Sequence, residues 1–146
     1  MNERKKPQPR PDFIIRDMIV QRIQHAIQKA QDAKALPQVD VGDVAVERPS
    51  DPRHGDFASS LPLRIARSAR MSPIDIAERL LNFLSSPEQI DRAWVEPPGF
   101  INFQLKDSWL QAQVDNVYAD GDKFGTLSVG NEQQVMIEFV SVNPTG

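Results

Sequence analysis

The chain has 146 residues, of which 40% are hydrophobic and 25% charged, so it suits one domain of ordinary size with a real core. It contains no cysteine, which excludes disulfides, zinc-thiolate sites and thiol nucleophiles and fits a reducing compartment. No apolar stretch reaches the roughly 18 to 20 residues of a membrane span, and the N-terminus lacks the apolar segment of a secretory signal. We therefore expect a cytoplasmic protein without a membrane partner.

The first twelve residues, MNERKKPQPRPD, predict a disordered basic arm. They hold four Lys or Arg residues against two acidic residues. They also contain three prolines and no periodic apolar residues. From residue 13 on, 13 basic residues face 18 acidic ones, so the body of the protein is acidic. Non-specific binding of nucleic acid depends on many contacts to phosphates, so RNA recognition by this body would require a local site. A basic arm can contact nucleic acid, but a solvated tail is the favoured interpretation.

The first predicted element is an amphipathic helix from Phe13 to Leu36, ended by Pro37. Its apolar residues recur at three- and four-residue steps: Ile15, Ile19, Ile23, Ala26, Ile27 and Ala30. The next segment, QVDVGDVAVERP, alternates valines with polar residues, which predicts a half-buried strand interrupted at Gly42 and Asp43. The stretch RPSDPRHGDF is predicted to be a loop.

Helical spacing resumes over residues 61 to 69. Pro62 cannot lie in a helix interior without losing a hydrogen bond, so this helix either begins near Ser59 or Ser60 or is kinked. The stretch SPID then marks another helix start, with Ser72 as N-cap, a proline at the first helical position and an acidic residue in the first turn.

The segment IDRAWVEPPGFINFQL predicts a hairpin of two strands, Ile90 to Val95 and Phe100 to Leu105, joined by a tight Pro-Pro-Gly turn. Successive side chains of a strand point to opposite faces. One face of the second strand therefore carries the core residues Ile101, Phe103 and Leu105, and the exposed face carries Phe100, Asn102 and Gln104.

Asp107 or Ser108 is predicted to cap a further helix that ends before DGDKFG, and the last predicted element is a strand from Gln134 to Val140. The order is helix, strand, two helices, hairpin, helix and strand. It favours a small antiparallel or mixed sheet with helices packed mainly on one face over regular parallel crossovers. The predicted fold class is α+β.

Few residues in this sequence carry catalytic chemistry. The chain has two histidines, too few for a histidine metal cluster, and no Gly-rich phosphate loop of a common spacing. His25 is predicted to be solvated. For His54 the favoured interpretation is a loop residue whose ring bonds a nearby carbonyl while Asp56 caps the following turn, and the alternative is contact with a ligand. The sequence therefore does not contain a complete active site.

The exposed face of the second hairpin strand is the first site-like feature. Phe100 offers an aromatic platform, and Asn102 and Gln104 offer amides that donate and accept hydrogen bonds. This combination suits an unstacked nucleic-acid base, which stacks on the ring while its edge is hydrogen-bonded. On the pattern alone, the favoured alternative is that Phe100 packs against a helix and the amides are merely solvated.

The second site-like feature is the terminal segment EFVSVNPTG. It places Glu138, Ser141 and Asn143 near the carboxyl end of a predicted strand, where open α/β sheets bind ligands. On the pattern alone, a ligand site and a solvated strand end are equally favoured.

Five motifs follow one another along the chain: HGDF at 54 to 57, PIDIAERL at 73 to 80, GFINFQL at 99 to 105, FG at 124 to 125 and IEFVSVNPTG at 137 to 146. In their order and spacing they resemble the N-terminal region of arginyl-tRNA synthetases. The resemblance covers about residues 13 to 146, and its most specific part is the terminal motif, which in that family leads into the ATP-binding signature of class I synthetases. That signature would begin at residue 147.

The resemblance implies roles for particular residues. The N-terminal domain of that family is an additional α+β domain that contacts the outer corner of tRNA and reads a base of the D-loop. The family pattern places the aromatic ring for that base on Phe100 and the amide on Asn102, with Gln104 as a third partner. The residues that match the family's site for the substrate arginine are Glu138, Ser141 and Asn143.

The resemblance also implies a division of the chain into the arm at 1 to 12, a D-loop-contacting domain at 13 to 130 and the first strand and turn of a catalytic domain at 131 to 146. Family members are arginine-tRNA ligases, which use ATP with magnesium to charge tRNA(Arg) with arginine, and we expect a monomer. The present residues are expected to need no cofactor and to lack catalysis. Ser60 and Pro62 depart from the family pattern, which leaves the start of that helix open.

A different class of function remains: a protein-interaction module in which the face of FINF contacts another polypeptide and RNA is irrelevant. The residues that follow Gly146 would discriminate between the two, because a ligase continues into the two-histidine ATP signature.

Overall fold

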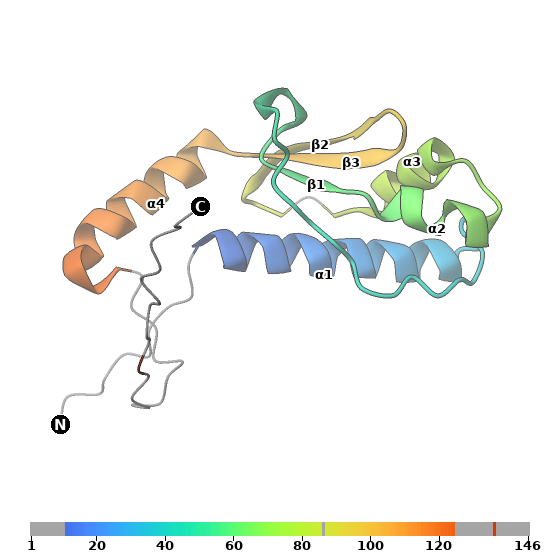
Figure 1. The fold of residues 1–146 in the computed structure, drawn as a ribbon, viewed down its shortest axis with the longest axis horizontal. Helices are drawn as coiled ribbons and strands as arrows, with labels where there is room; N and C mark the ends of the chain where they lie inside the picture. The colour runs from blue at the N-terminus through green and yellow to red at the C-terminus, as the bar shows by residue number, and fades with distance from the viewer. Residues whose placement is uncertain (1–10, 86, 125–135, 137–146) are drawn as a thin grey trace, which may run out of the picture.

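The computed structural model describes residues 11–85, residues 87–124 and residue 136 (Figure 1). The fold is α+β, as predicted, with a three-stranded antiparallel sheet and four α-helices in this part of the chain. Most of the predicted arm lies outside the described residues, and so does the predicted strand from Gln134 to Val140 apart from Met136. The elements are α1 (Pro11–Asp32), η1 (Pro52–His54), β1 (Phe57–Ser59), α2 (Leu61–Ala69), α3 (Pro73–Phe83), β2 (Ile90–Glu96), β3 (Phe100–Leu105), α4 (Asp107–Asp120) and η2 (Gly121–Lys123).

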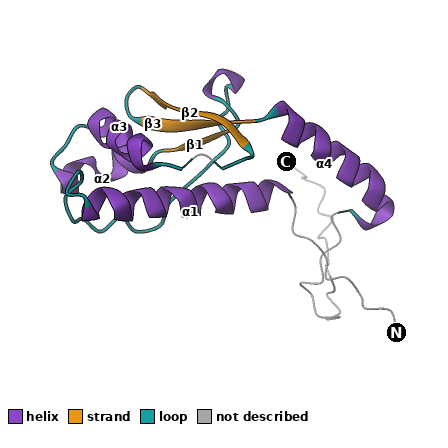
Figure 2. Cartoon of the chain, turned by 180° about the vertical axis from the view of Figure 1, so that it is seen from behind, coloured by secondary structure: helices purple, strands orange, loops and turns teal. Residues whose placement is uncertain are grey.

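The sheet has the strand order β1-β3-β2, so β3 is central and pairs with a neighbour on each side. Figures 1 and 2 show α1 running along one side of this sheet, with α2 and α3 gathered at one of its ends. The helices thus cover mainly one face, which we call the core face. Among the described residues, no α-helix covers the opposite face of the sheet, which we call the outer face.

Helix α1 supplies one wall of the core. All six apolar residues of its predicted stripe are buried against α3 and the sheet. The helix starts at Pro11, inside the predicted arm, and ends at Asp32, before the predicted end at Leu36. Lys34 adopts a left-handed conformation with φ 57, and the N–H groups of Ala35 and Leu36 both donate to the carbonyl of Ala30. The helix therefore ends in a left-handed turn rather than at Pro37.

The predicted strand in QVDVGDVAVERP is wrong, because this segment is extended but unpaired until Glu47 forms an isolated bridge with Ala58. Side chains take the place of a neighbouring strand as hydrogen-bond donors. The guanidinium of Arg64 donates to the carbonyls of Val41 and Asp43. The alternating valines instead pack on the core, where Val44 and Val46 are buried.

The start of α2 shows how this helix accommodates Pro62, and the start of α3 tests the predicted N-cap. Ser60 occupies the N-cap position of α2 and Pro62 lies in its first turn, where no intrahelical hydrogen bond is lost, so the helix is not kinked. The predicted N-cap of α3 is confirmed, since the Ser72 hydroxyl accepts a hydrogen bond of 3.1 Å from the Asp75 N–H.

The predicted hairpin is confirmed as β2 and β3, and it gains a third strand that the sequence analysis missed. Strand β1 begins at Phe57, the last residue of the predicted loop, and pairs with β3 through Phe57 and Phe103. Asp56 fastens the start of β1, because its N–H donates to the Phe103 carbonyl at 2.8 Å and its Oδ2 accepts from the Leu105 N–H at 2.8 Å. The prediction that Asp56 caps a following turn is therefore wrong.

Helix α4 begins one residue after β3, with Lys106 rather than Asp107 or Ser108 as its N-cap. It contains no buried residue, and only Trp109 packs against the core. Its exposed apolar residues are Leu110, Val114, Val117 and Tyr118. Within the part of the chain that the structure describes, no helix has both the length and the apolar character of a membrane span.

Candidate functional site

The outer face of β3 carries the residues that the alternation assigned to it. Ile101, Phe103 and Leu105 are buried on the core face, as predicted. On the outer face, Phe100 and Gln104 are half-buried, which leaves part of each side chain accessible. The predicted exposure of Asn102 is wrong: its exposed fraction is 1%.

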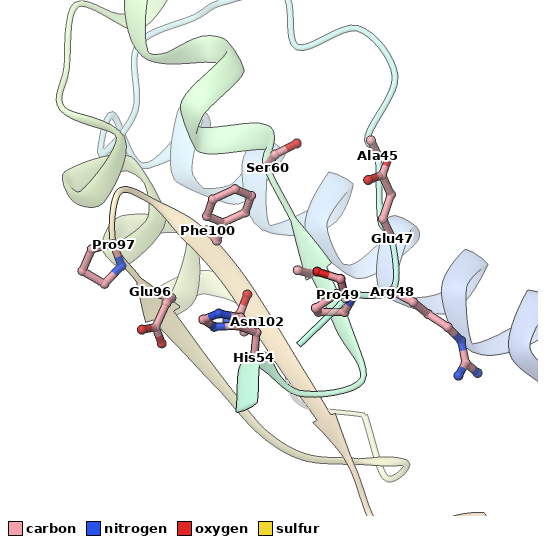
Figure 3. A pocket seen from close by; sticks show the side chains of 12 residues that line it. Ala45, Glu47, Arg48, Pro49, His54, Ser60, Glu96, Pro97, Phe100 and Asn102 are labelled. Carbon is pink, nitrogen blue, oxygen red and sulfur yellow. The ribbon is translucent and has the colours of Figure 1, made fainter. Parts of the chain in front are cut away.

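The burial of Asn102 follows from its place in the sheet. It lies on the central strand, in register with Ala58 of β1 and Trp94 of β2, so a neighbouring side chain flanks it on each side. Asn102 is also flanked by His54 and by the segment at residues 45–50, which together enclose a hollow (Figure 3). Strand alternation predicts the face of a side chain but not what encloses it.

This hollow is a cavity of about 490 Å³ on the outer face. Figure 3 shows Phe100, Asn102 and His54 between Glu96 and Pro97 on one side and the segment from Ala45 to Pro49 on the other. Its size falls in the range of small-ligand sites. The residues that line it are Ala45, Glu47, Arg48, Pro49, Ser50, His54, Ala58, Ser60, Glu96, Pro97, Phe100 and Asn102.

The amide of Asn102 is an incomplete hydrogen-bonding group in this cavity. Its Oδ1 is buried and has no hydrogen-bond partner among the residues that the structure describes. Leaving a buried acceptor unpaired costs about 1 to 3 kcal/mol. A ligand with an N–H or O–H donor would supply the missing bond.

Phe100 provides an apolar surface beside this acceptor. Its side chain lines the cavity and is not among the hydrophobic residues that pack against the core. The alternative that Phe100 packs against a helix is therefore not supported. An aromatic face next to an unpaired amide oxygen can hold a flat heterocycle by stacking and one edge hydrogen bond.

Two carboxylates, Glu47 and Glu96, also line the cavity. Glu96 is oriented by the Trp94 indole, whose Nε1 donates to its Oε2 at 2.9 Å. Neither Glu96 nor Trp94 was predicted as a site residue, because the alternation of β3 alone does not give the cross-strand register that places them beside Phe100 and Asn102. Carboxylates in the lining favour a ligand that donates hydrogen bonds, and Arg48 adds a cation to the same lining.

His54 lines the cavity at the end of η1. In the described part of the chain its ring forms no hydrogen bond with a carbonyl, so the favoured interpretation from the sequence is wrong. The turn that carries it is closed by Asp51, whose side chain accepts from the backbone N–H of Arg53 at 2.9 Å. The Arg53 guanidinium, hydrogen-bonded to the same carboxylate, holds the pKa of Asp51 below its usual range.

Gln104 lies on the same face as Phe100 and Asn102 but outside the cavity lining. Its Oε1 accepts a hydrogen bond of 3.1 Å from Nε of Arg92 on β2. The structure thus brings Phe100 and Asn102 together in the cavity. The third residue expected to contact a base, Gln104, is instead hydrogen-bonded to Arg92.

The residues expected to bind arginine, which are Glu138, Ser141 and Asn143, lie outside the described residues. No group of three His, Cys, Asp or Glu side chains that could hold a metal ion occurs among the residues described.

Comparisons with known proteins agree on one family. A family model described as the arginyl tRNA synthetase N terminal domain matches residues 17–105. Arginine-tRNA ligases of Dehalococcoides mccartyi strain CBDB1 and Ruminiclostridium cellulolyticum are each 35% identical, over 132 and 133 residues that make up 90% of this chain. The chain spans only 24% of the length of each of these relatives.

Solved structures show the same likeness. The arginyl-tRNA synthetase of Thermus thermophilus is 26% identical with a TM-score of 0.52, over 67% of this chain and 15% of that one. The arginyl-tRNA synthetase of Plasmodium falciparum has a TM-score of 0.57 at 16% identity, over 71% of this chain and 18% of that one, and supports the fold alone.

Proposed function

The chain belongs to the family of arginyl-tRNA synthetase N-terminal domains, and we propose that it is the tRNA-binding domain of an arginine-tRNA ligase. The observation that carries this proposal is the buried, unpaired Oδ1 of Asn102 beside the half-buried ring of Phe100 in an outer-face cavity. We propose that this cavity receives one unstacked base from the D-loop of tRNA(Arg).

The chemistry of the cavity supports a base as the ligand. A base stacks on an aromatic ring with about 1 to 3 kcal/mol per stack, because every base has a flat π face. The Asn102 oxygen requires a donor, which the edge of a base supplies through an N–H group. Glu96 and Glu47 add hydrogen-bond acceptors at the rim for further N–H groups of the base.

The rest of the proposal concerns the whole ligase. We propose that it is a cytoplasmic monomer that activates arginine with ATP and magnesium and transfers it to tRNA(Arg). We assign no step of this reaction to the described residues. Glu138, Ser141 and Asn143 remain the residues of this chain that we propose for arginine binding.

The test is the kinetics of aminoacylation by the full-length ligase with Phe100→Ala or Asn102→Ala. We expect kcat/KM for tRNA to fall roughly ten-fold to a hundred-fold, because the base loses its stack or its edge hydrogen bond. The KM values for arginine and ATP should change less than two-fold, since the cavity contacts neither in this proposal.

Tyr118→Ala provides a matched control, because Tyr118 is an aromatic residue of α4 with an exposed fraction of 91%. It should charge tRNA like the wild type. If Phe100→Ala and Asn102→Ala also bound and charged tRNA normally, the cavity would not be the tRNA contact, and a polypeptide partner would become the better explanation of this face.

A further inference from the structure

The outer face of the hairpin is a ladder of three cross-strand pairs. Arg92 lies opposite Gln104, Trp94 opposite Asn102, and Glu96 opposite Phe100. Neighbouring rungs are about 7 Å apart, because every second residue of a strand points to the same face. The cavity occupies the Glu96 end of this ladder, and Arg92 occupies the other end.

Arg92 is an exposed cation that two neighbours hold in place. Its Nε donates to Gln104 Oε1 at 3.1 Å, and its Cζ lies 4.5 Å from the centroid of the Trp94 ring. Among the described residues no carboxylate forms an ion pair with it. Both contacts leave the terminal Nη1 and Nη2 groups unoccupied. A guanidinium restrained in this way loses less entropy when its planar fork binds an anion.

The ladder is electrically polar from end to end. Trp94 lies between the two charges, with the Arg92 guanidinium over its ring and Glu96 accepting from its indole N–H. Glu47 adds a second carboxylate at the cavity end, so the two carboxylates there outnumber the guanidinium of Arg48, which also lines the cavity and whose Cζ lies 5.4 Å from the centroid of the Phe57 ring. A nucleotide has a matching polarity, because its phosphate is anionic and its base carries neutral N–H donors.

We propose that Arg92 binds the backbone phosphate next to the base held in the cavity, and so sets the direction in which the RNA strand crosses the outer face. This inference rests on the proposed function and adds a residue and an orientation to it. Gln104 acts here as a positioning residue for Arg92 rather than as a contact to the base.

The experiment measures binding of a tRNA(Arg) transcript to the 146-residue chain between about 50 and 200 mM salt. Arg92→Ala should weaken binding roughly ten-fold at the lowest salt, because one charge-assisted contact is lost. It should also make the slope of log K against log salt shallower by about 0.7 to 0.9, the value for one phosphate. Arg92→Lys keeps the charge without the fork and should retain the slope while losing part of the affinity.

Lys29→Ala is the control, because it removes one exposed positive charge from α1, in the helical layer on the core face. Its affinity should stay within about two-fold of the wild-type value, and its salt slope within about 0.3, because this charge touches no phosphate. Thermal unfolding of each variant verifies that the fold is retained.

Alkylation of individual tRNA phosphates locates the contact. Wild-type protein should show interference at one phosphate beside the bound base, and Arg92→Ala should lose that interference alone. The inference is overturned if Arg92→Ala behaves like Lys29→Ala, or if it changes the preference for a base without changing the salt slope.

Failure of the proposed function gives a different result. In that case the wild-type chain does not bind the transcript, or Asn102→Ala retains wild-type base discrimination. Loss of discrimination in Asn102→Ala together with an unchanged Arg92→Ala would overturn only the role of Arg92.

Discussion

The two faces of strand β3 use the same backbone for opposite purposes. On the core face, Ile101 and Phe103 are fully buried among apolar neighbours. On the outer face, Asn102 is equally buried but has an unpaired oxygen. Burial therefore stabilises the fold on one face, whereas on the other it holds an acceptor ready at a cost in stability. The comparison separates residues that maintain the fold from residues that we propose for binding.

The largest effect is expected from Phe103→Ala on the core face. This change leaves a cavity in the centre of the sheet and should reduce the free energy of unfolding by about 3 to 5 kcal/mol. Urea denaturation measures it. Phe100→Ala, only three residues away but half-buried on the outer face, should cost less than about 1.5 kcal/mol. Equal losses for the two variants would mean that the faces do not differ as described.

An intermediate effect of the opposite sign is expected from Asn102→Leu. An apolar side chain of similar size removes the unpaired oxygen, so the free energy of unfolding should stay unchanged or rise by about 1 to 2 kcal/mol. Binding of tRNA should fall at the same time. A clear loss of stability, measured in the same urea titration, would show that the amide has a structural partner and that the acceptor is not held ready for a ligand.

The smallest effect is expected from Gln104→Ala, which removes the hydrogen bond that orients Arg92. Stability should change by less than about 0.5 kcal/mol, as is usual for a surface position. The affinity for tRNA should fall about two- to three-fold, because the guanidinium becomes freer before it binds. Fluorescence anisotropy resolves such a change. An unchanged affinity would mean that Gln104 does not position Arg92 for binding.

Local signals in the sequence predicted much of this fold. The stripe on α1, the N-cap at Ser72 and the alternation in β3 are each encoded within a few residues, and each is confirmed. Strand β1 has only three residues, too few for an alternation to stand out from a loop. The valines at 39 to 46 alternate because they pack on the core, so their pattern imitates a strand that has no neighbour.

The candidate site was predictable only in part, for a similar reason. Phe100 and Asn102 share a face by strand geometry alone. The cavity around them requires segments that are distant in sequence, among them the extended segment at 45–50 and η1. No periodicity within the strand encodes these long-range contacts, so the burial of Asn102 and the roles of Glu96 and His54 could not be derived from the pattern.

Helix α4 is joined to β3 by a single residue, Lys106. Its 14 residues extend about 21 Å, and none of them is buried against the body. A rotation of roughly ten degrees about the backbone of Lys106 would therefore displace the far end of the helix by about 4 Å. The two dihedral angles of Lys106 thus affect where the far end of α4, at Asp120, lies relative to the cavity.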